Sequence, residues 1–287
     1  MATTLVTGTS TGIGHATAVH MARKGHRVFA TMRNPAQAEL GELARAEGLS
    51  ITILPLDVDS DASVQAAVEK VLSLSPRIDA LVNNAGVGFS GPLEEMPLSD
   101  IRQVMETNFF GALRCIKAVV PSMRENGGGH IVNVTSVAGR IAGAAQGAYA
   151  ASKWALEAAS ESLAQEVAQF GIRVAIVEPG IIHTPIFGKM GAPMPGTRYS
   201  HTRRLQTLFE KANEHPASPF IVAERIEAII GGGTGTLRHP VGPDAEPFLK
   251  WRQSMSDEEW VKFGALEDRA WGGERIKRDF GLELGLD

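Results

Sequence analysis

Hydrophobic positions in the first 185 residues fall into short apolar runs that alternate with longer helical stretches. The runs are rich in Val and Ile, which predicts strands at 3–8, 26–32, 51–57, 79–86, 130–136 and 172–180. The stretches between them predict helices at 13–25, 35–48, 63–74, 99–125 and 149–170. Strands that are apolar on both faces and joined by helices are typical of parallel sheets. The pattern therefore predicts an α/β fold, with a doubly wound parallel sheet of about seven strands and helices on both faces.

The pattern changes after position 184. The segment 185–217 carries Gly, Pro and Met, and we interpret it as a flap. A helix is expected at 218–230, a last strand at 235–242, and a short helix from Ser256, where Ser-x-x-Glu has the spacing of a capping box. The stretch from about 264 is polar and Gly-rich and carries no recognisable motif. We expect one domain over 1–287, with the flap at 185–217 and a variable C-terminal extension from about 243.

Composition restricts the classes of partner. A chain of 287 residues with 44% hydrophobic and 21% charged residues is expected to fold around a sizeable core. The net charge of −4 argues against nucleic acid as a partner, and we interpret the basic run at 201–204 as a solvated helix start. No apolar run is long enough to predict a membrane span, and the first strand leaves no room for a signal peptide.

The single cysteine, Cys115, excludes an internal disulfide and a Cys-based zinc site. Its place in an apolar helical pattern predicts a small core residue. We expect no metal site and a cytoplasmic location, in agreement with this cysteine usage.

The segment TGTSTGIG, residues 7–14, separates the first expected strand from the first helix. Its three glycines permit a tight turn and let backbone N–H groups approach a pyrophosphate at the helix N-terminus. NAD-binding units place a carboxylate about 20 residues further on, where it receives the ribose hydroxyls. This chain has Met32 there, followed by Arg33. A missing carboxylate and an added guanidinium favour the 2′-phosphate of NADP.

Tyr149 and Lys153 in YAASK lie four residues apart, on one face of an expected helix. At about 4 Å and an effective dielectric of about 20, the ammonium would stabilise a phenolate by about 4 kcal/mol. We therefore expect the pKa of Tyr149 to fall from about 10 towards about 7, where the phenol exchanges protons readily. Ser136 ends the strand at 130–136, at the sheet edge where ligands bind, and Asn108 lies in the preceding helix.

Seven segments together resemble the short-chain dehydrogenase/reductase superfamily: TGTSTGIG, LDV, NNAG, METNFFG, NVTS, YAASK and PGIIHT. They span about residues 3–185 in the superfamily's order. The end of the second strand, RVFATMR, is nearest in pattern to NADP-preferring hydroxysteroid and retinol dehydrogenases, which act as carbonyl reductases. The resemblance implies a Rossmann-like fold and an oxidoreductase that interconverts a ketone or aldehyde and an alcohol with a nicotinamide cofactor.

The resemblance also implies roles for single residues. Tyr149 would protonate the substrate oxygen, and Ser136 would hydrogen-bond the substrate carbonyl. Lys153 would lower the pKa of Tyr149 and bind the nicotinamide ribose, and Asn108 would hold a water that links Lys153 to solvent. The expected cofactor-binding residues are Gly8, Thr9, Ser10, Thr11, Gly12, Ile13, Gly14, Arg33, Asp57, Val58, Asn84, Ala85, Gly86, Tyr149, Lys153, Pro179, Gly180, Ile182 and Thr184.

The expected cofactor is NADP(H), with NAD(H) as the weaker alternative. Some NADP-binding members carry a basic residue just before the second glycine of the turn, where this chain has Thr11. Arg33 would therefore be the main phosphate contact.

Apolar side chains in three segments predict a pocket for a bulky apolar carbonyl substrate, because such pockets have mostly apolar walls. The alternative that several of these side chains only pack the flap against the sheet stays open, above all for Ile186 and Phe187. The expected pocket residues are Val87, Phe89, Val137, Ile141, Ala142, Phe187, Met190 and Met194.

Two other hypotheses stay open: a noncatalytic NADP(H)-binding sensor or scaffold, and another reaction on the same fold, such as dehydration or epimerisation. The joint presence of the four expected catalytic residues favours catalysis. The resemblance further suggests a homodimer or homotetramer formed through the helices at 99–125 and 149–170.

Overall fold

The computed structural model describes residues 1–286 except 38, 187–195, 213, 215–216 and 234, and the side chains of 37 and 273 are also outside the description. Its centre is a seven-stranded sheet in the order β3-β2-β1-β4-β5-β6-β7, with all neighbours parallel. The strands are β1 Thr3–Thr7, β2 Arg27–Met32, β3 Ile51–Pro55, β4 Ala80–Asn83, β5 Gly129–Val134, β6 Ile172–Pro179 and β7 Arg238–Val241. The predicted doubly wound parallel sheet is confirmed.

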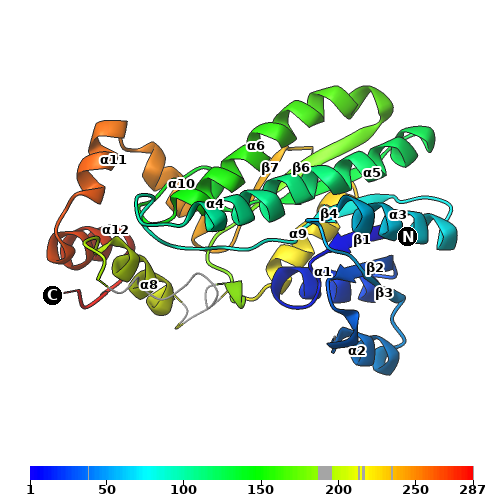
Figure 1. Ribbon diagram of the computed structural model, residues 1–287, viewed down its shortest axis with the longest axis horizontal. Coiled ribbons are helices and arrows are strands. Elements are labelled where there is room, and N and C mark those ends of the chain that lie inside the picture. The colour runs from blue at the N-terminus through cyan, green and yellow to red at the C-terminus, as the bar shows by residue number, and fades with distance from the viewer. Residues whose placement is uncertain (38, 187–195, 213, 215–216, 234, 287) are drawn as a thin grey trace.

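Helices cover both faces of the sheet (Figure 1). One face packs against α1 (Gly12–Arg23), α2 (Leu40–Glu47) and α9 (Phe220–Ile230), and the other against α3 (Asp61–Leu74), α5 (Gly111–Glu125) and α6 (Gly147–Val167). Successive strand residues point to opposite faces, so Val6 joins the first core and Leu5 the second. Cys115 is fully buried in the second core, as predicted. Across the described residues, none of these helices combines the length and apolarity needed to cross a membrane.

The long helix expected at 99–125 is continuous but not uniform. It consists of α4 (Leu98–Met105), a π-helical segment (Glu106–Phe110) and α5. Gly111 follows the π-helical segment, and a Cβ there would lie 2.8 Å from Val58 Cγ2. The absent side chain lets the helix approach the loop after β3. Such π segments are frequent at functional sites, and this one contains Asn108.

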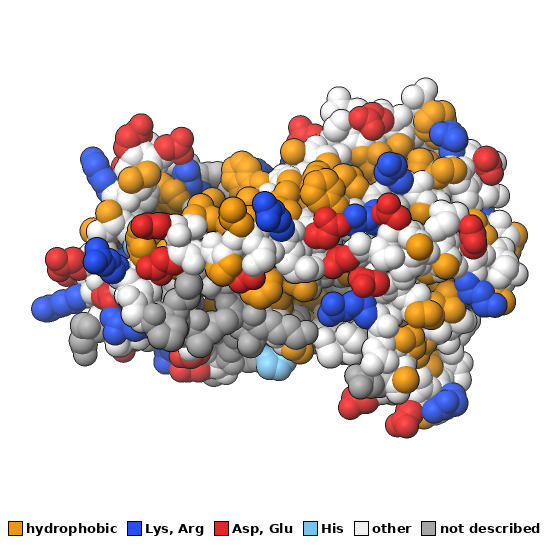
Figure 2. Space-filling view, viewed as in Figure 1, with side chains coloured by type: hydrophobic (Ala, Val, Ile, Leu, Met, Phe, Trp, Pro, Cys, Tyr) orange, Lys and Arg blue, Asp and Glu red, His pale blue; other side chains and the backbone are white. Residues whose placement is uncertain are grey.

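Large hydrophobic side chains are exposed on the face formed by α4, α5 and α6. Leu98 is 65% exposed, Phe110 45% and Trp154 48%. Figure 2 shows hydrophobic side chains gathered over this face. Exposed apolar area of this kind marks a candidate surface for association.

The C-terminal region adds helical segments beyond the sheet. They are α8 (His201–Ala212), α10 (Ala245–Gln253), α11 (Asp257–Gly264), a π-helical segment (Arg269–Ile276) and α12 (Lys277–Phe280), and α8, α11 and α12 gather at one end of the molecule (Figure 1). The predicted capping box at Ser256 and Glu259 is confirmed. Ile276, Leu284 and Leu286 are buried against Phe263. The tail that looks polar in sequence therefore supplies part of a hydrophobic core.

The basic run at 201–204 does begin a helix, α8, and Arg203 is exposed, but the expected solvation is wrong for Arg204. Arg204 is only 6% exposed and forms an ion pair with Asp268. It also donates to the Gly264 carbonyl oxygen over 3.3 Å. These partners lie about 60 residues away in sequence, so the local pattern does not reveal them.

Candidate active site

A cavity of about 760 Å³ runs along the carboxyl ends of the strands. Its wall begins at the glycine turn between β1 and α1, passes the residues that follow β4, β5 and β6, and ends among helices of the C-terminal region. The edge of an open parallel sheet is the usual ligand site in this architecture.

The glycine turn is shaped by close backbone contacts. Gly8 has φ +71°, and a Cβ on it would lie 2.7 Å from Ala85 Cα. A Cβ on Gly14 would lie 2.3 Å from the Gly8 carbonyl oxygen, so no side chain fits at that position. Gly12, with φ +61°, lies against Thr184, whose Cγ2 would be 3.1 Å from an added Cβ. The turn brings the N-terminus of α1 to the cavity, and the first helical turn, GIGH, carries no carboxylate to repel a phosphate.

The NNAG segment after β4 holds this turn in place. The Asn84 side-chain amide donates to the carbonyl oxygens of Thr7 and Gly8, over 2.9 and 3.0 Å. The backbone N–H groups of Asn84 and Ala85 each donate to Thr7 Oγ1 over 3.0 Å. All predicted cofactor-binding residues line the cavity except Thr9 and Gly14. Thr9 is buried behind the wall, where its hydroxyl donates to the Thr31 carbonyl oxygen over 3.2 Å.

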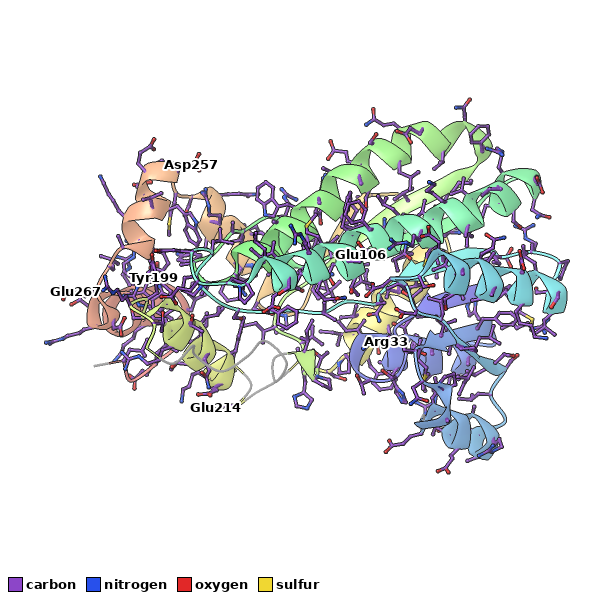
Figure 3. The ribbon with its side chains drawn as sticks, in the orientation of Figure 1. Arg33, Glu106, Tyr199, Glu214, Asp257 and Glu267 are labelled. Carbon is purple, nitrogen blue, oxygen red and sulfur yellow. The ribbon has the colours of Figure 1, made fainter. Side chains whose placement is uncertain are left out.

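Met32 and Arg33 lie at the end of β2, where an NAD-binding unit would offer a carboxylate. Met32 is 3% exposed, whereas Arg33 is exposed and lines the cavity (Figure 3). Among the described residues, none forms an ion pair with Arg33. Its guanidinium is therefore available to an anionic group bound in the cavity.

Ser136, Tyr149 and Lys153 meet in the middle of the cavity wall. The Ser136 hydroxyl accepts from the Ala138 N–H over 3.1 Å and hydrogen-bonds Tyr149. Lys153 is 4% exposed, and its Nζ donates to the Val134 carbonyl oxygen over 3.0 Å. The same Nζ lies 5.7 Å from the centre of the Tyr149 ring.

The protonation of this group differs from the expectation based on spacing. Burial raises the pKa of Tyr149 to about 12, against the smaller lowering effect of the hydrogen bond with Ser136. Burial also lowers the pKa of Lys153 to about 8, against the opposing charge of Glu157. The predicted fall of the Tyr149 pKa towards 7 is therefore wrong for this structure, because burial of the phenol dominates and the opposing effect comes from the Ser136 hydrogen bond rather than from Lys153. At neutral pH Tyr149 carries its proton, which is the form that can donate to a carbonyl oxygen.

Asn108 lies behind the cavity wall rather than in it and is 1% exposed. Its Oδ1 accepts from the Val87 N–H over 2.8 Å, and its Nδ2 donates to the Val87 carbonyl oxygen and to Ser152 Oγ over 2.9 and 3.0 Å. The side chain thus ties the NNAG loop to α6 next to Lys153. The water-holding role expected for Asn108 stays a prediction.

The expected substrate residues separate into three groups. Val87, Val137, Ile141 and Ala142 line the cavity, whereas Phe89 is partly buried outside its lining. Phe187, Met190 and Met194 lie outside the described residues.

Sequence reasoning missed an aromatic wall at the far end of the cavity. Its members are Phe209, Phe248, Trp251, Trp260, Phe263, Trp271 and Phe280. Trp251 packs edge-on against Trp260, Phe263 and Phe280, with ring centres 4.9 to 5.4 Å apart. Trp260 Nε1 donates to the Ala142 carbonyl oxygen over 3.0 Å, which connects this wall to the loop after Ser136. The signal in the sequence is that three of the four tryptophans fall within 251–271.

The described residues contain no group of three His, Cys, Asp or Glu side chains that could hold a metal ion. A doubly wound sheet with a glycine turn and a Ser-Tyr-Lys group at its carboxyl edge is typical of nicotinamide-dependent oxidoreductases. The family profile described as short chain dehydrogenase matches residues 2–194. The chain belongs to the short chain dehydrogenase family, whose members bind nicotinamide cofactors.

Two curated relatives match most of the chain. Retinol dehydrogenase 8 of Bos taurus is 38% identical over 262 residues, covering 86% of this chain and 83% of the relative. The 3-ketodihydrosphingosine reductase of Bacteroides thetaiotaomicron is 41% identical over 243 residues, covering 83% and 87%.

Solved structures agree with the fold. A short-chain dehydrogenase from Streptomyces avermitilis has a TM-score of 0.80 and 34% identity, covering 92% of this chain and 96% of that one. A short chain dehydrogenase/reductase from Burkholderia phymatum in complex with NAD has a TM-score of 0.78 and 25% identity, covering 88% and 93%. An alcohol dehydrogenase from Thermococcus sibiricus complexed with 5-hydroxy-NADP has a TM-score of 0.70 and 26% identity, covering 84% and 94%.

Proposed function

We propose that this protein is an NADP(H)-dependent carbonyl reductase, or alcohol dehydrogenase in the reverse direction, that acts on bulky apolar ketones or aldehydes. The observation that carries the proposal is the continuity of the cavity. One wall joins the glycine turn, the Ser136-Tyr149-Lys153 group and the aromatic side chains of the C-terminal region. Cofactor, reacting carbonyl and apolar substrate body can therefore occupy one connected space.

Ser136 and Tyr149 would bind the carbonyl oxygen, because their hydroxyls already lie within hydrogen-bonding distance of each other. Tyr149 would donate its proton to the oxygen as negative charge develops there, and Ser136 would stabilise that charge. The Lys153 ammonium would bind the ribose hydroxyls next to the nicotinamide and favour the transient phenolate. The bound NADPH would supply the hydride.

Preference for NADP(H) is supported by the end of β2. Arg33 offers a guanidinium to a phosphate, and Met32 offers no carboxylate to the ribose hydroxyls. The glycine turn fits the rest of a dinucleotide, because close contacts that leave no room for a Cβ at Gly8 and Gly14 bring the N-terminus of α1 to the cavity. NAD(H) remains the weaker alternative.

A bulky apolar substrate is supported by the aromatic wall and by the names of two relatives, a retinol dehydrogenase and a 3-ketodihydrosphingosine reductase. Arg204, which lines this end of the cavity, is paired with Asp268. Burial alone would raise the pKa of Asp268, but hydrogen bonds from Arg203, Arg204 and Ser200 lower it to about 2. The Arg204 guanidinium is thus bound to Asp268 rather than free for an anionic substrate.

We further propose one catalytic domain over 1–287, since described residues of the flap at 185–217 and of the extension from about 243 both line the cavity. The exposed side chains of Leu98, Phe110 and Trp154 support a homodimer or homotetramer through α4, α5 and α6. Light scattering of the purified chain tests this assembly. A cytoplasmic location is consistent with the single buried cysteine.

A carbonyl panel with NADPH and NADH tests the proposed reaction. We expect bulky aryl and alicyclic ketones to show higher kcat/KM than small charged keto acids, and NADPH to exceed NADH. Faster reduction of keto acids would overturn the apolar substrate class. Tight NADPH binding without turnover of any carbonyl compound would instead support a sensor.

A further inference from the structure

Glu157 extends the catalytic face of α6 by one more turn. Tyr149, Lys153 and Glu157 follow one another at intervals of four residues, so their side chains lie on the same side of the helix. Glu157 is 4% exposed and does not line the cavity. A carboxylate buried this deeply needs hydrogen-bond or ion-pair partners. The partners of Glu157 connect it to the Ser136-Tyr149-Lys153 group.

The Glu157 carboxylate binds the strand end that carries Ser136. Its Oε1 accepts from Thr135 Oγ1 over 2.7 Å. Thr135 lies between Val134, whose carbonyl oxygen receives Lys153 Nζ, and Ser136 itself. Behind this contact, a Cβ on Gly139 would lie 2.9 Å from Glu157 Cγ. Glu157 therefore packs directly beneath the turn that follows Ser136.

Two arginines and a second glutamate surround Glu157. Arg238 of β7 donates from Nε to Glu157 Oε2 over 2.9 Å, and Arg140 pairs with Glu178 of β6 over 3.2 Å. Glu178 is buried, and its burial and the charge of Glu157 both raise its pKa. The Thr135 hydroxyl and the Arg238 guanidinium both donate to the Glu157 carboxylate, so the buried group has the partners it needs.

Glu161 provides a natural comparison on the same helix. It also binds Arg238, but its side chain is 55% exposed. The charged or titratable groups around Lys153 and Glu157 are thus Tyr149 and Glu161 on α6, Arg140 after Ser136, Glu178 on β6 and Arg238 on β7. Of the carboxylates among these groups, Glu157 is the one that stands one helical turn from Lys153 in the buried region.

We propose that Glu157 is a positioning residue that keeps the buried Lys153 ammonium charged and holds the Thr135–Ser136 segment in place. The effect of Glu157 on turnover rests on the proposed function, whereas the electrostatic coupling between Glu157 and Lys153 does not. Burial lowers the pKa of Lys153 to about 8, and the charge of Glu157 opposes this fall. A lysine is charged below its pKa. Removal of the Glu157 carboxylate should therefore let the Lys153 ammonium lose its proton at a lower pH than in the wild type.

Titration of the Lys153 side chain tests the coupling without turnover. The ¹³Cε resonance of Lys153 can be followed by NMR in the full chain and assigned with the Lys153→Met variant. We expect Glu157→Gln to lower the titration midpoint by about one pH unit, as expected for loss of one nearby opposite charge. Glu161→Gln should leave the midpoint unchanged. An unchanged midpoint in Glu157→Gln, or an equal fall in both variants, would overturn the proposal.

A second variant keeps the test decisive if Glu157→Gln does not fold. Arg238→Gln removes a positive charge that competes for Glu157, so it should raise the Lys153 midpoint. A fall or no change in that variant would contradict the proposal as well.

The pH profile of the reaction tests the catalytic consequence. With a substrate that the wild type turns over, Glu157→Gln should lose kcat several-fold near pH 8 and little near pH 6, because Lys153 stays charged at the lower pH. Glu157→Asp should restore part of the loss, whereas a purely structural role would lower kcat equally at both pH values. If the wild type has no carbonyl activity but the midpoint falls, the proposed function fails and the Glu157–Lys153 coupling stands.

Discussion

The two ends of the cavity differ in what lines them: backbone contributes much of the wall at one end, and large side chains form the wall at the other. At the end that we propose for the cofactor, the wall includes the backbone of the glycine turn, where added Cβ atoms on Gly8 and Gly14 would lie 2.7 and 2.3 Å from neighbouring backbone atoms. At the substrate end, the wall consists of large aromatic side chains from α8, α10, α11 and the segment 269–280. A backbone surface has few ways to change, whereas an aromatic surface changes with each substitution. The cofactor end is therefore suited to one invariant ligand and the substrate end to a variable one.

The two ends of the cavity also differ in whether their arginines are paired with carboxylates. Arg33 faces the cofactor end without an ion pair among the described residues, whereas Arg204 at the other end is paired with Asp268. The comparison predicts selectivity for charge at the first end and for shape at the second. Tyr149 lies between them and should matter for every substrate and cofactor.

Replacing the proton donor between the two ends should have the largest effect. Tyr149→Phe keeps the ring and removes only the hydroxyl, so we expect kcat to fall about 10²- to 10⁴-fold with NADPH affinity preserved. Tyr199, the only other tyrosine, binds Glu94 beside the C-terminal helices (Figure 3), and Tyr199→Phe is the matched control. Steady-state kinetics and NADPH fluorescence measure both quantities. Near-normal kcat in Tyr149→Phe would remove Tyr149 from the catalytic group.

Adding one methyl group to the glycine turn should be the next most damaging change. Gly8 and Gly48 both have positive φ, +71° and +64°, but only at Gly8 would the new Cβ collide with backbone, 2.7 Å from Ala85 Cα. We expect Gly8→Ala to cost roughly 3 kcal/mol in free energy of unfolding and to weaken NADPH binding. Gly48→Ala should cost about 1 kcal/mol and leave NADPH binding intact. If urea titrations gave equal losses of stability for Gly8→Ala and Gly48→Ala, the close contact between Gly8 and Ala85 would not be what shapes the turn.

Cofactor selectivity should depend on Arg33. Arg33→Ala removes a charge-assisted hydrogen bond of about 1.5–3 kcal/mol, so NADPH affinity should fall roughly ten- to a hundredfold while NADH affinity stays nearly constant. Met32→Asp in addition should make the chain prefer NADH, because the carboxylate accepts from ribose hydroxyls and repels the 2′-phosphate. Arg173→Ala, at an exposed position on β6, is the control. If the NADPH:NADH ratio of kcat/KM does not move in Arg33→Ala, the phosphate is held elsewhere in the turn.

The aromatic wall should give a smaller, substrate-dependent effect. Phe280→Ala opens the far end of the cavity, so kcat/KM should fall about tenfold for a bulky aryl ketone and change little for a small ketone. Phe170 is 36% exposed and lies outside the cavity lining, so Phe170→Ala should affect neither. A loss that is the same for both ketones would mean that Phe280 supports the fold rather than the substrate.

The cofactor end could be predicted from the sequence because its residues act through local motifs. Gly8, Gly12 and Gly14 occur in one turn, and the strand before and helix after it fix where they lie. The aromatic wall could not be predicted, because its contacts join distant segments: Trp260 and Ala142 are 118 positions apart. The spacing of Tyr149 and Lys153 correctly predicted a shared helix face, but their pKa values depend on burial, which spacing does not report. Asn108 was found by its motif, whereas its bonds to Val87 and Ser152 required the structure.

The central claim is that hydride and proton meet at one carbonyl in the middle of the cavity. It is tested most directly with NADPH deuterated at both C4 positions and a bulky aryl ketone, followed by mass spectrometry of the product. We predict an alcohol with one deuterium on the carbinol carbon from the wild type, and almost no product from Tyr149→Phe although the cofactor still binds. A product without deuterium, or no alcohol from any ketone in the presence of bound cofactor, would contradict the account.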